Sequence, residues 1–333
     1  MQGFCVAKRV RGRGDILPLP YHIPVMREEV VASWGTDRSG IYVEGTLGGG
    51  GHAEALLDRL TEPGCLIGID RDEEALAAAE ERLRRFGRRV VLKQGLFSEM
   101  AAILKDLEIV EVSGVLFDLG VSSHQIDRPE RGFSYSQDGP LDMRMGRTYN
   151  VRGPHKRTQT AADVVNTYSQ QALTDLFHRY GEERWSRRIA RGICALREKK
   201  PFERTSELRK AILSAIPGSA PQKTLARIFQ ALRIEVNDEI RELERGLETA
   251  ISLLKIGGHI VVLSYHSLED RTVKRIFRKY IRGCQCPPGL PVCGCGGRRM
   301  LKTVGTAVPS VEEVQRNERA RSARLRVAEK IGG

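Results

Sequence analysis

The chain has 333 residues, of which 41% are hydrophobic and 29% are charged, and its net charge at pH 7 is +12. This length favours about two domains. We find no apolar run near the roughly 18 residues that cross a membrane and no secretory leader, which argues against a membrane protein and predicts a cytoplasmic, globular one. The positive charge favours a polyanionic partner over a small metabolite. The 6% aromatic content argues against a protein that binds single strands by stacking bases on aromatic rings.

The first segment with a structural pattern begins after residue 20. Residues 1–20 contain a basic stretch from Lys8 to Arg13 and no apolar pattern, so we predict a flexible basic extension. A helix is expected next, because Val30, Val31 and Trp34 share one helical face before Gly35.

A strand, glycine loop, helix and second strand are predicted between Ile41 and Asp72. The first strand ends at Glu44, and four consecutive glycines follow from Gly48 to Gly51. Glycines let the backbone turn sharply and approach a ligand without a Cβ in the way. The second strand ends at Asp70, whose carboxylate could accept hydrogen bonds from both hydroxyls of a ribose. The unit therefore predicts a cofactor that contains a nucleoside.

Two cofactor classes fit this loop. Gly48-x-Gly50-x-x-Ala53 satisfies the dinucleotide fingerprint, with Asp70 near the expected spacing of about 20 residues. The same stretch also fits an acid-first loop that begins at Glu44, as in methyltransferases that use S-adenosylmethionine, where the acid reaches the cationic end of the cofactor. A glycine turn without a ligand is disfavoured because tight turns normally use one or two glycines.

Strands and amphipathic helices then alternate as far as Asp118. A helix over 73–86, a strand at 90–92, a helix to about residue 107 and a strand over 112–118 predict a parallel α/β sheet with ligands at the carboxyl ends of its strands. Phe97, after the third strand, could either lie against an adenine ring or fill the core. Asp118 is predicted to contact the ligand, and a helix N-cap is its alternative role.

The pattern changes after the fourth strand. Charge, glycine and hydroxyl groups fill residues 122–145, and helical periodicity then continues to a break at 217–221. A long helix near 224–254 leads to a fifth strand over 257–264. We therefore predict a discontinuous cofactor-binding domain, 21–125 and 226–333, and an inserted helical substrate-recognition domain, 126–225.

Two polar motifs lie outside the glycine loop. Asp142 and Arg144 would by default form a surface ion pair. His266 and Ser267 follow the fifth strand, but no Gly-x-Ser-x-Gly elbow supports a Ser–His nucleophile. In the alternative reading, Ser267 caps the next helix and His266 orients the loop.

Two cysteine pairs stand near the C-terminus, Cys284-x-Cys286 and Cys293-x-Cys295. Without a secretion signal a disulfide framework is disfavoured. Four thiolates could form a tetrahedral zinc clip, although the pairs are spaced more tightly than usual. A reduced, exposed loop is the alternative. The cysteine spacing leaves both the zinc clip and the reduced loop open, and we expect no metal at the functional site.

Combined, these motifs resemble those of the MraW/RsmH family of S-adenosylmethionine-dependent methyltransferases, which act on N4 of a cytidine in 16S ribosomal RNA. The resemblance extends from about residue 21 to the C-terminus. Two features depart from the family pattern: Glu44 stands where many members have Asp, and residues 1–20 precede the usual start. The matching stretches are Glu44 to His52, Ile69 to Asp72, Phe117 to Ser123, Arg131 to Ser134, Asp138 to Met145, Gly181 to Arg184, Ser264 to Arg271 and Asn317 to Ser322.

The resemblance implies a class I, Rossmann-like α/β sheet with an inserted all-helical domain, S-adenosylmethionine as cofactor, and methylation in the decoding region of the small ribosomal subunit. No membrane partner is expected, and a homodimer stays open. We expect Asp118, Asp142 and His266 to surround N4, although the Pro-Pro motif typical of amino-methyltransferases is absent. The implied cofactor contacts are Gly50, Gly51, His52, Asp70, Phe97, Asp118 and Gln125.

Two rival functions remain from the sequence. A nicotinamide dehydrogenase would use the same glycine loop but would not need the basic charge. A non-catalytic RNA-binding factor for ribosome assembly could retain the cofactor fold without transferring a methyl group.

Overall fold

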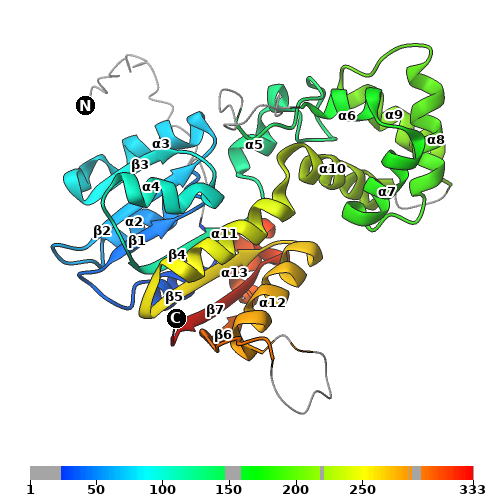
Figure 1. Ribbon diagram of the computed structural model, residues 1–333. Coiled ribbons are helices and arrows are strands. Elements are labelled where there is room, and N and C mark those ends of the chain that lie inside the picture. The colour runs from blue at the N-terminus through cyan, green and yellow to red at the C-terminus, as the bar shows by residue number, and fades with distance from the viewer. Residues whose placement is uncertain (1–23, 147–158, 218–220, 285, 287–293, 333) are drawn as a thin grey trace, which may run out of the picture.

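The computed structural model describes residues 24–146, 159–217, 221–284, 286 and 294–332 (Figure 1). The predicted extension at residues 1–20 and Cys293 lie outside these ranges. No helix among the described residues is long and apolar enough to cross a membrane.

Seven strands of the described chain form one sheet in the order β3-β2-β1-β4-β5-β7-β6. β1 to β5 run parallel, and β7 pairs antiparallel with both β5 and β6. The predicted class I, Rossmann-like α/β sheet is thereby confirmed. The bounds are β1 Ile41–Glu44, β2 Cys65–Asp70, β3 Val90–Gln94, β4 Val112–Asp118, β5 Leu254–Ser264, β6 Leu301–Ala307 and β7 Arg324–Lys330.

Helices cover both faces of this sheet (Figure 1). Successive strand residues point to opposite faces, so Tyr42 packs into one apolar layer and Val43 into the other. The layer on Tyr42 contains α1 Arg27–Trp34, α2 Gly51–Leu57 and α3 Glu73–Leu83. The layer on Val43 contains α4 Met100–Asp106, α11 Glu239–Leu253 and α12 Ser267–Arg282.

The insert after β4 has a core of its own. Its helices are α6 Ala161–Thr167, α7 Gln170–Gly181, α8 Ser186–Arg197, α9 Thr205–Ala215 and α10 Pro221–Asn237. Buried side chains such as Phe177 of α7 and Leu232 of α10 pack in a cluster separate from both sheet layers. Figure 1 shows these helices projecting to one side of the sheet, with α10 leading back to it.

Short elements complete the chain: α5 Ser123–Asp127, α13 Val311–Arg316, and the 3₁₀ helices η1 Arg84–Arg89, η2 Phe97–Glu99, η3 Pro129–Arg131 and η4 Glu318–Ser322. The strands β6 and β7 were not predicted, and one arginine of β7 is engaged within the fold rather than left for a polyanion. This residue, Arg326, donates to Asp270 of α12 at 2.6 Å.

The long helix predicted near 224–254 is two helices. Asp238 adopts a left-handed conformation, φ 52°, and separates α10 from α11. Residues 225–234 pack in the core of the insert, whereas the predicted domain boundary at residue 226 falls inside α10. We therefore propose that the insert extends to Asp238.

Candidate functional site

A cavity of about 360 Å³ lies where the carboxyl ends of β1, β2, β4 and β5 meet the insert. Ligands of open α/β sheets bind at this edge. Six predicted cofactor residues line it, namely Gly51, His52, Asp70, Phe97, Asp118 and Gln125, and the predicted catalytic His266 lines it as well. Gly50 and Asp142 do not.

The glycine loop is held in place by backbone hydrogen bonds. Gly48 and Gly50 adopt positive φ angles of 52° and 74°, which glycine tolerates best. Gly50 donates to the Leu47 carbonyl at 2.9 Å, and an added Cβ at Gly50 would lie 3.2 Å from Leu83. Gly50 thus shapes the turn, whereas Gly51 lines the cavity.

Asp70 stands at the tip of β2 beside this loop. Its two carboxylate oxygens accept the Gly48 and Asp72 amides at 2.8 and 2.9 Å. Burial raises the pKa of Asp70 to about 6, although those amides partly oppose the shift. A ligand with hydroxyl donors would favour the charged form, because it would replace lost hydration.

Glu44 and His52 contribute polar atoms that lack partners. Glu44 is buried, and its Oε2 has no hydrogen-bond partner among the described residues. Burial, with the nearby charges of Asp118 and Asp70, raises the pKa of Glu44 well above its usual value. Both ring nitrogens of buried His52 also lack hydrogen bonds within the described chain, with Nε2 3.5 Å from Asp118 Oδ2. Unpartnered buried polar atoms on a cavity wall indicate a polar ligand.

Asp118 is oriented by two hydrogen-bond partners. Its backbone amide donates to the Thr46 hydroxyl at 2.6 Å, and its Oδ1 accepts the Tyr265 hydroxyl at 2.7 Å. Burial, together with the charge of Asp118, raises the pKa of Tyr265 well above its usual value. Tyr265 therefore remains a hydrogen-bond donor at neutral pH. The sequence motif contained Tyr265, but nothing in its spacing indicated this role.

His266 is the N-cap of α12, so the alternative reading in which Ser267 caps this helix is wrong. His266 Nδ1 accepts the Glu269 amide at 3.4 Å, and Nε2 lies 3.1 Å from Glu269 Oε1. Burial alone would raise the pKa of Glu269, but the charge and hydrogen bonds of its neighbours, His266 foremost, lower it. Ser267 instead donates to Glu182 of the insert at 3.0 Å.

Two further charged residues lie on the cavity wall beside His266. Glu239, His266 and Glu269 have ligand atoms within 4.8 Å of one another. Arg233 donates to both oxygens of Glu239 at 2.8 and 2.9 Å. Its guanidinium supplies a positive charge beside these carboxylates, so we assign no metal to them. Sequence reasoning missed Arg233 and Glu239, which lie on either side of the break at Asp238.

Phe97 is both a core residue and a cavity residue. Its ring packs edge-on against Phe117, with centroids 5.2 Å apart. Gly246 of α11 allows this position, since an added Cβ would come within 2.3 Å of the Phe97 ring. Phe97 can therefore fill the core and still present part of its ring to a ligand in the cavity.

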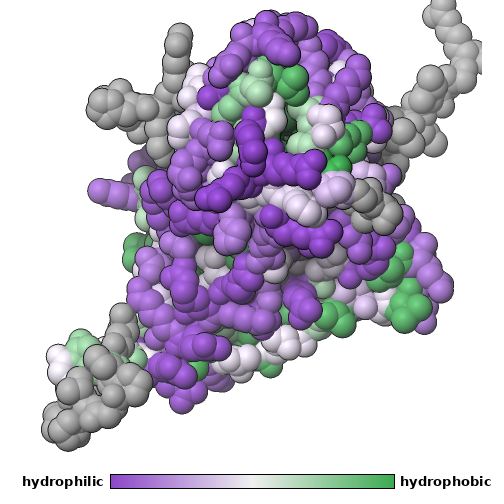
Figure 2. All heavy atoms as spheres, turned by 90° about the vertical axis from the view of Figure 1, so that its right-hand side faces the viewer, coloured by the Kyte–Doolittle hydropathy of each residue, from purple (hydrophilic) through white to green (hydrophobic). Residues whose placement is uncertain are grey.

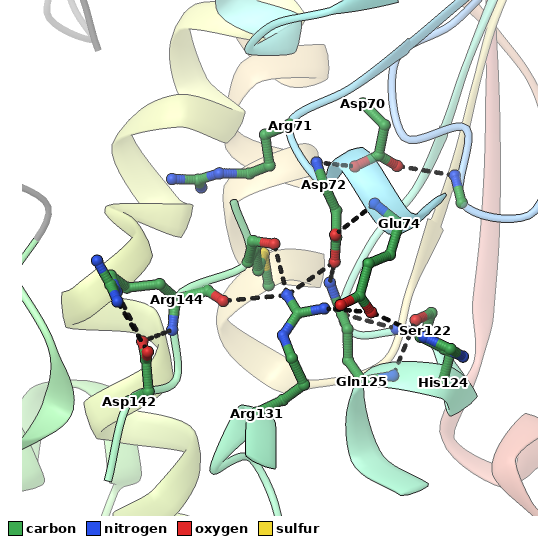
Figure 3. Close-up of polar contacts among 12 residues, drawn as sticks. Asp70, Arg71, Asp72, Glu74, Ser122, His124, Gln125, Arg131, Asp142 and Arg144 are labelled. Atoms are coloured by element: carbon green, nitrogen blue, oxygen red, sulfur yellow. Dashed lines mark hydrogen bonds and ion pairs between the residues drawn. The ribbon is translucent and has the colours of Figure 1, made fainter. Parts of the chain in front are cut away.

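Gln125 is held by hydrogen bonds to its neighbours (Figure 3). Its amide donates to Asp72 at 2.8 Å and accepts the Ser122 amide at 3.1 Å. Asp72 is also paired with Arg131 at 2.8 Å, and both side chains are only 1% exposed. Arg131 in turn donates to the Met145 carbonyl at 2.7 Å. This buried pair joins the start of α3 to the chain entering the insert, and sequence reasoning missed it.

Asp142 lies apart from Asp118 and His266. The Arg144 guanidinium binds both Asp142 oxygens, at 2.7 and 2.9 Å (Figure 3). This is the ion pair that was the default interpretation of the motif. For Asp142 to act on a substrate, its carboxylate would have to release Arg144 and accept a hydrogen bond from the substrate instead.

Comparisons with known proteins cover nearly the whole chain. Residues 20–331 match the model of the MraW methylase family. Proteins named "Ribosomal RNA small subunit methyltransferase H" are among its relatives. The one from Geobacter sulfurreducens is 50% identical over 93% of this chain and 99% of its own. That from Carboxydothermus hydrogenoformans is 47% identical over 93% of this chain and 98% of its own.

Proposed function

This chain belongs to the MraW methylase family, and from that premise we propose that it methylates N4 of one cytidine in the RNA of the small ribosomal subunit. S-adenosylmethionine is the methyl donor that goes with this family and fold. The choice of N4 of a cytidine in the decoding region as the methylated atom rests on the motif resemblance. The observation that carries the proposal is the buried Glu44 carboxyl on the cavity wall, whose Oε2 has no hydrogen-bond partner among the described residues.

The described residues fit this cofactor. Glu44 would face its cationic end, where a positive charge would return the carboxyl to its anionic form. Asp70 would accept the ribose hydroxyls, and Phe97 would lie against the adenine. A dinucleotide would instead place a pyrophosphate in this part of the site, where its negative charge would gain nothing from a buried carboxyl group.

The bound cofactor supplies a methyl group already activated by its sulfonium. The chain's own residues then have to position N4 of cytosine, a poor nucleophile because its lone pair is delocalised into the ring. N4 has two protons to donate, so it needs acceptors. Asp118 is the acceptor in the proposal, and Tyr265 holds one of its oxygens so that the carboxylate keeps its orientation. His266 and Asp142 complete the proposed catalytic set.

The insert carries the surface proposed to meet RNA. Figure 2 views the side of the molecule on which α7, α8 and α9 lie in Figure 1, and hydrophilic side chains cover most of it. Arg187, Arg188 and Arg191, here called the α8 arginines, are exposed and form no ion pair with any described residue. Phosphates are the matching partners for such a row. On α12, by contrast, Arg271 and Arg275 are already paired with Glu182 and Glu244.

The direct test is methyl transfer from labelled S-adenosylmethionine to small subunits that lack the modification, followed by nucleoside mass spectrometry. N4-methylcytidine at one position is expected. Label in another nucleoside would overturn the substrate. Cofactor binding without any label would instead favour an assembly factor. The target base must leave its stack to reach the cavity, at a cost of a few kcal/mol. A preformed loop of the ribosomal subunit would lower this cost, so a short naked oligonucleotide should react more slowly. Equal rates would refute the preference for an assembled subunit.

The catalytic set has its own test. Asp142→Asn and His266→Ala should each lower turnover at saturating substrate. Asp138→Asn is the matched control for Asp142, since Asp138 also pairs with an arginine, Arg204, at 2.7 Å in the same region. Near wild-type turnover in both variants would remove Asp142 and His266 from the set.

A further inference from the structure

Three cysteines meet beside the C-terminal end of α12, away from the cofactor cavity. The sulfur atoms of Cys284, Cys286 and Cys295 lie within 4.8 Å of one another. These residues are separated by up to eleven positions in the chain. A group of thiols this compact has three ordinary explanations: a disulfide, hydrogen bonds between thiols, or a shared metal ion.

The distance between sulfur atoms separates these explanations. Cys284 Sγ and Cys295 Sγ are 3.8 Å apart, nearly twice the about 2.05 Å of a disulfide. Zinc–sulfur bonds of about 2.3 Å in a tetrahedral site place neighbouring sulfurs about 3.8 Å from each other. The observed separation excludes a disulfide and matches two ligands on one tetrahedral ion, and it is also the length of the hydrogen bond that the Cys295 thiol donates to Cys284.

The backbone on both sides of the cysteines is closely packed. Gly283 ends α12 with φ 71°, and its amide donates to the Lys279 carbonyl at 3.1 Å. A Cβ added at Gly297 would lie only 2.0 Å from the Gly283 carbonyl oxygen. Just beyond, the Met300 amide donates to the Tyr280 carbonyl at 2.9 Å. The two ends of the loop therefore meet through contacts that do not depend on the thiols, and they bring Cys284 and Cys295 together.

We propose that Cys284, Cys286 and Cys295 supply three of the four ligands of a structural zinc ion. Thiolates are soft ligands that suit zinc, and three of them on two chain segments would join the end of α12 to the segment that precedes β6. The exposed Arg298 and Arg299 follow directly, so this link would also fix the position of a positively charged segment. The proposal does not depend on the substrate of the methyl transfer.

Metal analysis of the full chain tests the proposal. The protein is purified under reducing conditions, and zinc is measured by mass spectrometry after dialysis against a moderate chelator. About one zinc per chain is expected, falling at least tenfold in Cys284→Ser, Cys286→Ser and Cys295→Ser. Cys194→Ser is the matched control, because this half-buried cysteine lies in α8. Cofactor binding and circular dichroism identify variants that fold.

Cobalt substitution gives a second readout that does not rely on variants. Cobalt(II) in the site should show sulfur-to-metal charge transfer in the near ultraviolet and the intense visible bands of a tetrahedral complex. Three results would overturn the proposal: a folded chain that retains no zinc when zinc is supplied, zinc that persists in Cys284→Ser and Cys295→Ser, or a Cys284–Cys295 disulfide in protein prepared under reducing conditions.

Discussion

The buried pair of Asp72 and Arg131 should be essential for joining the insert to the sheet. Arg131 donates to Asp72 at 2.8 Å, to Glu74 at 3.2 Å and to two backbone carbonyls. Replacing Arg131 with Met would leave the Asp72 carboxylate buried without its charge partner. Removing one partner of such a pair costs about 3 to 5 kcal/mol. Asp72 would keep its hydrogen bonds from the Glu74 amide and Gln125, so we expect the lower end, about 3 kcal/mol.

The two tryptophans allow this loss to be assigned to a part of the molecule. Trp34 is buried in the sheet core, and Trp185 packs against the core of the insert. In a Trp185→Phe background, urea unfolding followed by fluorescence reports on the sheet alone. Arg131→Met should lower the free energy of unfolding there by about 3 kcal/mol. The exposed ion pair of Arg128 with Glu130 is the control, and Arg128→Met should cost less than about 1 kcal/mol.

A double-mutant cycle with Asp72→Asn then isolates the pair. The two losses should fail to add by about 1.5 kcal/mol or more, since either single change already breaks the interaction. Equal losses in Arg131→Met and Arg128→Met, or strictly additive effects, would refute the reasoning.

Three more predictions concern the site and its partner. Burial raises the pKa of folded Asp70 to about 6, so its contribution to stability is present below about pH 4 and is lost as the pH rises through 6. Asp70→Asn should therefore flatten the dependence of the free energy of unfolding on pH between about 4 and 6. Calorimetry should find that cofactor affinity rises over the same pH interval in the wild type and not in this variant. Tyr265→Phe removes a hydrogen bond to Asp118 worth about 1.5 to 3 kcal/mol, so single-turnover transfer with saturating cofactor should slow about tenfold or more; an unchanged rate would exclude this role. Replacing the α8 arginines with Gln should lower the slope of log affinity for RNA against log salt by about 2, and an unaltered slope would place the RNA elsewhere.

The parts of the fold that could be predicted are those in which one local pattern fixes the three-dimensional arrangement. Strands with acids at their tips alternate with amphipathic helices, and parallel strands bring those tips to one edge. For that reason Asp70 and Asp118 could be placed in one cavity from the sequence alone. The insertion was predictable because helical periodicity interrupts this alternation.

The remaining features depend on partners that are far apart in the chain. Tyr265 and Asp118 are separated by 147 positions, and Arg131 and Asp72 by 59. No local pattern records such pairings. The break at Asp238 was missed because the apolar periodicity continues across it without proline or glycine. β6 was missed because this edge strand is mostly exposed and lacks a continuous apolar run, and β7 because arginine, glutamate and lysine interrupt its apolar residues.

The position of the insert also bears on the order in which the protein can assemble during synthesis. β4 pairs with β5, Val112 with Leu254, so the centre of the sheet cannot close until most of the chain has left the ribosome. Closing a long flexible loop costs entropy that grows with its length. The insert has a separate core and can fold before β5 is made. Once folded, it replaces a long flexible loop with a compact body, so that β5 reaches β4 across a much shorter effective distance.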